Sequence, residues 1–205
     1  MGTPANTVIQ GAADGSNAWI TNLTGTYSNN ERSWVQSPPI DLRNAVNPEI
    51  LLHVWWATEV LYDGAYVQAS TDYGQTWRRV GSNGSGTNWY NRNVMTGTFA
   101  NANGGNHHCW SGEEANGSGG WVQARHALVD DQGNSFAGHV VMLRVYFSSD
   151  SSVVRNGIAF DRVILRETPA GSSLWVNRMP VDNLVGGKVY NEDLTQEHVM
   201  TFQAA

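Results

Sequence analysis

The sequence contains very little cysteine and lysine, and it has no net positive charge. Its 205 residues include one cysteine, Cys109, and one lysine, Lys188. A single cysteine excludes an internal disulfide, so the chain is not a disulfide-held scaffold. The formal net charge is -6, and Arg78-Arg79 is the only pair of adjacent basic residues. This charge argues against a nucleic-acid partner, because such partners require clustered positive charge.

Long hydrophobic runs and helical periodicity are also scarce. The longest apolar run, residues 50–57, is interrupted by His53 and is too short to cross a bilayer, so no membrane span is expected. Residues 1–167 show no sustained helical period. Only "DLTQEHVM", residues 193–200, predicts a short helix, with Asp193 near its start.

Glycine, tryptophan, asparagine and serine are abundant instead. The chain has 22 glycines and 9 tryptophans, with hydrophobic residues at 40% and charged residues at 15%. Such a chain is too apolar for disorder, and its composition is typical of all-β sandwiches with long loops. This composition is common outside the cell, so we expect a secreted or cell-surface protein. Without disulfides, a bound metal is one candidate for stabilising it.

Six segments have the composition and alternation of β-strands. Between the third and fourth lies a long glycine- and asparagine-rich region, residues 82–120, whose interleaved aromatics predict an ordered loop packed on a sheet. The predicted strands are residues 50–58, 65–70, 76–81, 121–129, 139–149 and 156–167.

The segment "STDYGQTW", residues 70–77, joins the second and third predicted strands as a β-hairpin. This Asp-box pattern occurs in several copies in sialidases, but here there is one copy, no arginine cluster, and too short a chain for a propeller. We expect Asp72 to accept hydrogen bonds from the turn, Gly74 to supply a positive φ, and Trp77 to fix the register. The pattern therefore predicts a structural turn rather than a catalytic site.

Four segments in order carry a family resemblance: "SPPIDLRNAVNPEILLHVWW", "YDGAYVQASTDYGQTWRRV", "GWVQARHALVD" and "VMLRVYFSSDSSVVRNGIAFDRVIL". Over about residues 8–167 the chain resembles the MAM-like jelly-roll domains, which include accessory domains of immune-inhibitor-A-type peptidases, cleaved-adhesin modules and reelin repeats. The resemblance implies a two-sheet antiparallel jelly-roll β-sandwich of the concanavalin-A-like kind. We therefore expect a sandwich domain over 1–167 and a separate tail, 168–205, that the resemblance does not cover. We expect this tail to pack either on its own sandwich or on a neighbouring subunit.

Oxygen-bearing side chains on flexible loops indicate a calcium site. Asp14 and Asn17 lie in a glycine-containing loop, Glu59 and Asp63 lie in "TEVLYDG", and Asp161 lies in an otherwise apolar strand. The resemblance implies a structural calcium between an N-terminal loop and an acidic residue of the last strand, positions that Asp14 and Asp161 match. Glu59 and Asp63 match less closely, and Asp63 has the alternative of capping a turn.

A carboxylate in an apolar strand can also be explained by an ion pair instead of a metal. Asp161 needs a partner to be stable there, and Arg162 or Arg144 could supply a charge as well as a metal could.

No catalytic constellation is recognisable. His107, His108 and Cys109 are each possible zinc ligands, but adjacent side chains of an extended chain point apart. The same geometry prevents Glu113-Glu114 from acting as a glycosidase pair. We therefore expect no enzyme, with these residues in solvated or partly buried loops.

Aromatic residues beside glycine- and asparagine-rich loops are candidates for stacking on a ligand, namely Tyr62, Trp89, Tyr90 and Trp110. Together these features predict a non-catalytic, calcium-stabilised extracellular module for binding or adhesion to a glycan or protein surface. The alternative is a structural subunit of an extracellular assembly or filament. In that case self-assembly would use residues 170–205, which hold several large apolar side chains.

Overall fold

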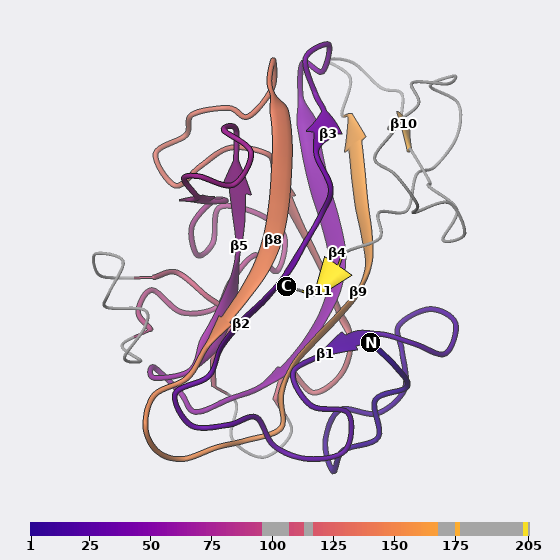
Figure 1. The fold of residues 1–205 in the computed structure, drawn as a ribbon, viewed down its shortest axis with the longest axis vertical. Coiled ribbons are helices and arrows are strands. Elements are labelled where there is room, and N and C mark those ends of the chain that lie inside the picture. The colour runs from indigo at the N-terminus through magenta and orange to yellow at the C-terminus, as the bar shows by residue number, and fades with distance from the viewer. Residues whose placement is uncertain (96–106, 113–116, 168–174, 177–202, 205) are drawn as a thin grey trace.

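The computed structural model describes residues 1–95, 107–112, 117–167, 175–176 and 203–204. Within these ranges the chain forms strands, turns and loops and no helix, so the expected all-β class is confirmed. Two antiparallel sheets pack face to face as a β-sandwich (Figure 1). The described residues include no helix long and apolar enough to cross a membrane.

The first sheet is built around two long strands that pair along most of their length. Its strand order is β1-β9-β4-β7, and β10 also pairs with β9. Its strands are β1 (Trp19–Ile20), β4 (Pro48–Ala57), β7 (Val122–Ala127), β9 (Gly157–Glu167) and β10 (Trp175–Val176).

The second sheet has the order β11-β2-β8-β5-β6, with β3 also paired to β8. In Figure 1 the C-terminal β11 lies beside β2. The strands of this sheet are β2 (Arg32–Gln36), β3 (Ile40–Asp41), β5 (Gly64–Ser70), β6 (Arg78–Arg79), β8 (Val140–Ser148) and β11 (Gln203–Ala204).

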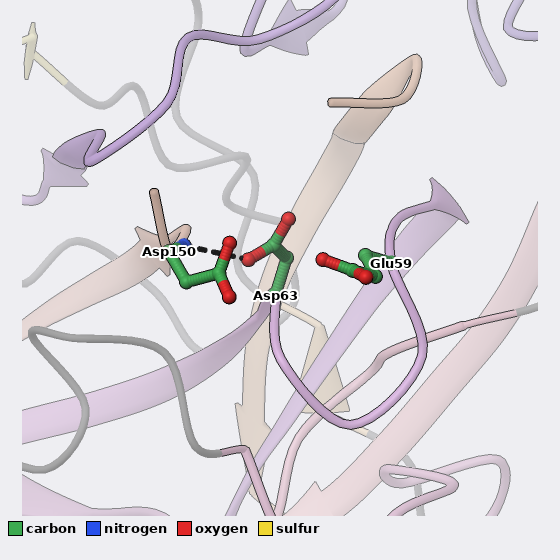
Figure 2. A group of neighbouring side chains, drawn as sticks. All are labelled: Glu59, Asp63 and Asp150. Carbon is green, nitrogen blue, oxygen red and sulfur yellow. Dashed lines mark hydrogen bonds between the residues drawn. The ribbon is translucent and has the colours of Figure 1, made fainter. Parts of the chain in front are cut away.

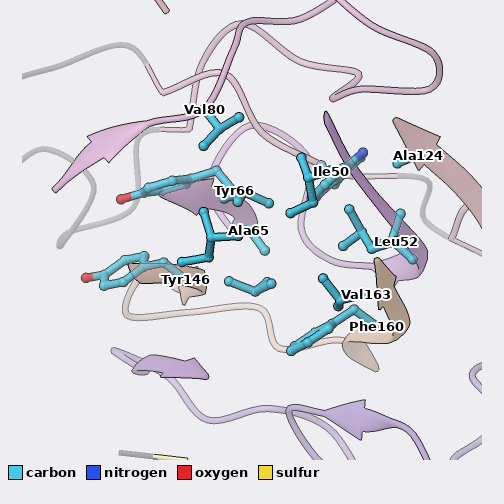
Figure 3. Packing of buried hydrophobic residues seen from close by; sticks show 14 of the residues in the cluster. Ile50, Leu52, Ala65, Tyr66, Val80, Ala124, Tyr146, Phe160 and Val163 are labelled. Atoms are coloured by element: carbon cyan, nitrogen blue, oxygen red, sulfur yellow. The ribbon is translucent and has the colours of Figure 1, made fainter. Parts of the chain in front are cut away.

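The core lies between the sheets and follows from strand alternation. Leu52 and Val54 of β4 are fully shielded, and Val67 of β5 is 1% exposed. Because successive side chains of a strand point to opposite faces, these residues gather on one face of each sheet. Figure 3 shows Ile50 and Leu52 beside Phe160 in this layer. A single hydrophobic core thus connects the two sheets.

Each of the six predicted strand segments contains a strand of the structure, namely β4 to β9. The third is shorter than predicted, with only Arg78–Arg79 paired to β5. Short strands β1, β2 and β3 were not predicted, since two to five residues give too little alternation to recognise. The helix expected at 193–200 lies outside the described residues.

Two short backbone segments of the predicted tail pair with strands of the sandwich. Trp175 and Val176 pair with Glu167 and Arg166 of β9. Gln203 and Ala204 pair with Gln36 and Val35 of β2. The rest of 168–205 lies outside the described residues.

Candidate metal centre

Three carboxylate side chains meet where the loop between β4 and β5 approaches the end of β8. Glu59, Asp63 and Asp150 each offer an oxygen within 4.8 Å of the others. Gly64 pairs with Ser148, which brings Asp63 beside the residues that follow β8. Figure 2 shows the three side chains converging from these two segments. Sequence analysis named Glu59 and Asp63 but missed Asp150, whose proximity depends on the β5–β8 pairing.

Asp63 is the fixed member of the group. It is fully buried, and its Oδ1 accepts the main-chain N–H of Asp150 at 2.7 Å. Its Oδ2 accepts the Tyr27 hydroxyl at 2.6 Å. A carboxylate has about four lone-pair positions, so these two bonds leave acceptor capacity for a cation.

The main chain around this group is held by further hydrogen bonds. The Thr58 hydroxyl donates to the Asp63 carbonyl at 3.0 Å, and the Asp63 N–H donates to the Glu59 carbonyl at 3.1 Å. Gly64 allows a close approach, because a Cβ there would lie 2.5 Å from the Trp110 carbonyl oxygen. The short loop is therefore fixed before any ion binds.

The electrostatics of the group disfavour three negative charges. Burial raises the pKa of Asp63 to about 6, with the charges of Asp150 and Glu59 adding to the rise and hydrogen bonds opposing it. Burial, followed by the Asp150 charge, also raises the pKa of Glu59. Glu59 Oε2 is shielded from solvent and has no hydrogen-bond partner among the described residues. A divalent cation would stabilise all three ionised carboxylates and supply a partner for Glu59.

Tyr27 connects the N-terminal region to this group. Its hydroxyl accepts the Glu59 N–H at 3.1 Å while donating to Asp63. Its ring packs edge-on against Phe147 at a centroid distance of 5.0 Å. Burial and the Asp63 contact raise the pKa of Tyr27, so it stays a neutral donor.

The remaining predicted metal residues lie at a different place. The Asp14 N–H donates to Asp161 Oδ2 at 2.9 Å, so the predicted proximity of these two residues is present. Asp161 is paired with His53 on the neighbouring strand β4. This pair lies four residues, or about 13 Å along the strands, from the Ala57–Gly157 pair, where β4 ends and the loop with Glu59 and Asp63 begins. The five predicted ligands therefore do not form one site.

Main-chain donors and one ion pair surround Asp14 and Asp161. Asp161 Oδ1 accepts the Arg162 N–H, and the Arg162 guanidinium lies 3.8 Å from Asp14 Oδ2. Asn17 Oδ1 accepts the Thr3 hydroxyl at 3.4 Å. The charge of Arg162 therefore faces Asp14, whereas Asp161 bonds two main-chain N–H groups.

Three of the four predicted ligand-stacking rings belong to the core. Trp89, Tyr90 and Trp110 are 1%, 4% and 0% exposed, and their rings contact one another. Tyr90 also donates to the Val80 carbonyl at 2.8 Å. These rings are not open to a ligand from solvent. Tyr62, at 47% exposed, is the only one of the four on the surface.

The Asp-box turn has the hydrogen bonds that its residue types favour. Asp72 Oδ1 accepts the Thr76 N–H at 2.9 Å, and the Thr76 hydroxyl donates to Oδ2. These two bonds, followed by the Ser70 hydroxyl, lower the pKa of Asp72 to about 2. Gly74 has a φ of 87°, and Trp77 Nε1 donates to its carbonyl at 3.0 Å. The Asp72 carboxylate, the hydroxyls of Ser70 and Thr76 and the Trp77 ring N–H are all used within the turn.

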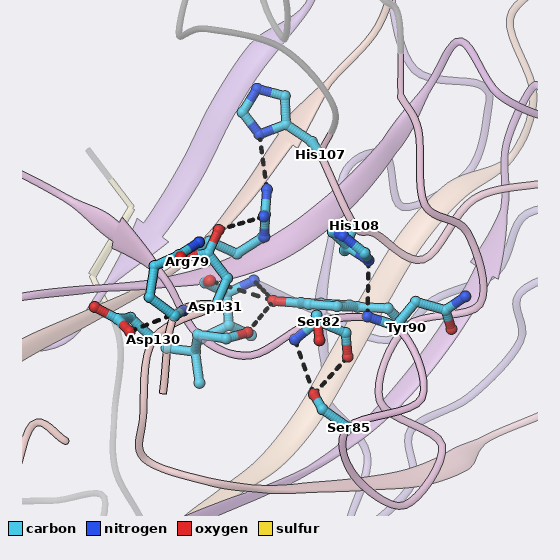
Figure 4. Close-up of polar contacts among 12 residues, drawn as sticks. Arg79, Ser82, Ser85, Tyr90, His107, His108, Asp130 and Asp131 are labelled. Carbon is cyan, nitrogen blue, oxygen red and sulfur yellow. Dashed lines mark hydrogen bonds and ion pairs between the residues drawn. The ribbon is translucent and has the colours of Figure 1, made fainter. Parts of the chain in front are cut away.

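The neighbouring His107, His108 and Cys109 do not converge. His107 stacks on Tyr66, while His108 Nδ1 accepts the Asn83 N–H at 2.9 Å (Figure 4). Cys109 is fully buried, and burial raises the pKa of its thiol to about 12. Such a thiol is a poor nucleophile and a poor zinc ligand. Glu113 and Glu114 lie outside the described residues.

No protein-family model matches the chain, and comparison with curated proteins finds no significant relative. The candidate site therefore depends on its own geometry.

Proposed function

We propose that the chain is a non-catalytic extracellular module for binding or adhesion, stabilised by calcium, that recognises a glycan or protein surface. The observation that carries the proposal is the group Glu59, Asp63 and Asp150. Oxygen-only ligands on short loops suit a hard cation, and Ca²⁺ tolerates irregular geometry and mixed main-chain ligands better than Mg²⁺ does. The jelly-roll topology and the MAM-like resemblance remain part of this proposal.

The position of the group supports a structural role for the ion. The three carboxylates join the β4–β5 loop to the end of β8, and Tyr27 joins the N-terminal segment to both. An ion here would cross-link three segments that are distant in sequence. It would stabilise the sandwich in the way that a disulfide stabilises other secreted domains.

Calcium binding can be tested on the folded chain by thermal denaturation. A ligand that binds only the native state adds RT ln(1 + [L]/Kd), about 2.7 kcal/mol at a hundredfold excess over Kd. We expect the melting temperature to rise with Ca²⁺, to rise less with Mg²⁺, and to fall after chelation. A melting temperature that is the same in chelator and in millimolar Ca²⁺ would overturn the proposal.

The tail favours one alternative function. Within the described residues, β11 pairs with β2 through Gln203 and Ala204, and β10 pairs with β9 through Trp175 and Val176. A strand added to a sheet edge in this way can also be supplied by another copy of the chain. The chain would then be a structural subunit of an extracellular assembly. Full-length oligomers that disappear when residues 170–205 are deleted would support this alternative.

A further inference from the structure

The second sheet has an outer face that carries aromatic and polar side chains in rows. In the first row Trp34 of β2, Tyr146 of β8 and Tyr66 of β5 lie directly opposite one another. Because side chains alternate, residues two positions further along project from the same face. That second row is Gln36, Arg144, Gln68 and Arg79.

This outer face points away from the core. Figure 3 shows the rings of Tyr66 and Tyr146 extending away from Leu52 and Phe160 of the first sheet. The rings of the first row contact one another: Trp34 and Tyr146 are stacked at 6.2 Å, and Tyr146 and Tyr66 lie at 5.3 Å. The three rings therefore form one continuous row, in which Tyr66 and Tyr146 are buried and Trp34 is partly exposed.

Arg144 lies at the centre of the outer face without a carboxylate partner. Among the described residues it forms no ion pair, and its Nε donates a hydrogen bond to Gln68 Oε1 at 2.7 Å. Its Cζ lies 4.1 Å from the ring centroid of Trp77 and 5.5 Å from that of Trp34. Burial lowers its pKa to about 10, so the guanidinium remains charged at neutral pH. The side chain is thus fixed, and no described residue accepts a hydrogen bond from either Nη group.

Two buried hydroxyls on the same face also lack partners. Tyr66 is 1% exposed and Tyr146 is 2% exposed, and neither hydroxyl has a hydrogen-bond partner in the described structure. Buried polar groups are nearly always paired, so unpaired ones call for an explanation. Burial raises the pKa of both phenols, which keeps them neutral and able both to donate and to accept. Because both side chains are shielded from solvent, they form the buried floor of the face and do not themselves reach a ligand.

The partly exposed side chains of this face together select one class of ligand. A guanidinium with both Nη groups available binds a carboxylate in a bidentate way. Half-buried indole rings such as Trp34 and Trp77 offer apolar faces for the C–H surface of a sugar ring. The side-chain amide of Gln36 suits sugar hydroxyls. A simple carboxylate would use only the guanidinium, and a neutral sugar would leave the charge unpaired.

We propose that the outer face binds a uronic-acid sugar, with Arg144 on its carboxylate and Trp34 against its ring. The charge of the face agrees with this ligand, because Arg32 projects from the same side of β2 as Trp34. Arg79, in the second row, is paired with Asp131 and adds no net charge. The acidic chain as a whole would repel such a sugar, so binding would be confined to this face. The inference rests on the proposed binding function and names its ligand.

Matched pairs of sugars test the carboxylate requirement. Glucuronate and galacturonate are titrated against the full chain by ligand-observed NMR and calorimetry, with glucose and galactose as controls that lack the carboxylate. We expect the acidic sugars to bind at least about tenfold more tightly than the neutral ones. Acetate and a short peptide with a free C-terminal carboxylate test whether a carboxylate alone is enough, and we expect both to bind more weakly than glucuronate.

Substitutions test the residue assignment. Arg144→Gln should abolish the preference for glucuronate, and Arg144→Lys should weaken it about tenfold, because an ammonium lacks the planar fork. Arg43→Gln is the matched control, since Arg43 is exposed and its ion pair among the described residues is with Asp41 of β3, two positions earlier. A thermal melt of each variant establishes folding. Should Arg144→Gln fail to fold, Trp34→Leu provides the second variant and is expected to weaken glucuronate binding.

Several outcomes would overturn the proposal. Folded wild-type chain that binds neither acidic sugar, or binds glucose as tightly as glucuronate, would refute it. Equal binding of the peptide would show a carboxylate receptor for peptides instead. The calcium melt on the same sample separates this failure from that of the proposed function. Calcium stabilisation without acidic-sugar binding refutes only the ligand, whereas sugar binding without calcium stabilisation refutes only the metal.

Discussion

The Tyr27 hydroxyl donates a 2.6 Å hydrogen bond to Asp63 Oδ2, joining a residue near the N-terminus to a fully buried carboxylate. The same oxygen accepts the Glu59 N–H at 3.1 Å. One phenol therefore orders two members of the carboxylate group at once. The stability and the metal chemistry of the group should both depend on it.

Replacing Tyr27 with phenylalanine should destabilise the fold. The substitution removes the donor to Asp63 and leaves the Glu59 N–H without its acceptor, a loss of about 1–3 kcal/mol of unfolding free energy. Urea denaturation at fixed Ca²⁺ measures it. Tyr62→Phe is the control, because that ring is 47% exposed and its loss should be near zero. Equal stability of Tyr27→Phe and wild type would show that the hydroxyl contributes nothing.

Asp150→Asn should remove most of the response to calcium. Its carboxylate is one of three oxygens within 4.8 Å, and a neutral amide is a weaker ligand for Ca²⁺. We expect the shift in melting temperature between Ca²⁺ and chelator to shrink to less than half. Asp161→Asn, at the other predicted acidic position, should retain the full shift. The reverse pattern would place the ion beside Asp14 and Asp161.

The metal-free protein should lose stability as the pH rises. The pKa of Asp63 is raised to about 6 in the folded chain, above its ordinary value, so the folded state holds this proton more tightly. The contribution is therefore present below pH 4 and is lost as the pH rises through 6. Melting temperatures in chelator between pH 4 and 7, with Asp63→Asn subtracted, isolate this effect. Saturating Ca²⁺ should suppress it, and a wild-type profile parallel to that of Asp63→Asn would contradict the assignment.

Gly74→Ala should destabilise the Asp-box hairpin without altering ligand binding. A Cβ at a φ of 87° costs about 1–2 kcal/mol, and it would lie 3.4 Å from the Trp77 ring. Chemical denaturation measures the loss. Gly25→Ala is the control, because that glycine has no positive φ and its Cβ would meet only the Asn22 side chain. A stable Gly74→Ala protein that no longer binds its ligand would make the turn functional rather than structural.

Deleting residues 170–205 should lower stability while the full-length chain remains monomeric. The deletion removes β10 from β9 and β11 from β2, exposing main-chain donors and acceptors. Thermal melts and sedimentation of both proteins measure the effect. Full-length oligomers that the deletion converts to folded monomers would instead support assembly through the tail. Unchanged stability and mass would show that the tail does neither.

The sequence by itself determined the class of fold. Segments such as 50–58 and 139–149 alternate or concentrate β-forming residues strongly enough to predict β4 and β8, because the period of side-chain burial is a local property. The turn formed by the Asp-box residues could be predicted equally well, since its hydrogen bonds connect residues no more than four positions apart.

Only the tertiary structure decided which carboxylates meet and which aromatic rings are buried. Asp150 reaches Asp63 through the pairing of Gly64 with Ser148, a contact across more than eighty positions that no local pattern encodes. In the same way, Trp110 beside a glycine-rich loop is a core residue, whereas Arg144 in an apolar strand faces outward. Strand register and sheet packing set these outcomes, because each depends on two segments at once, and composition describes only one segment at a time.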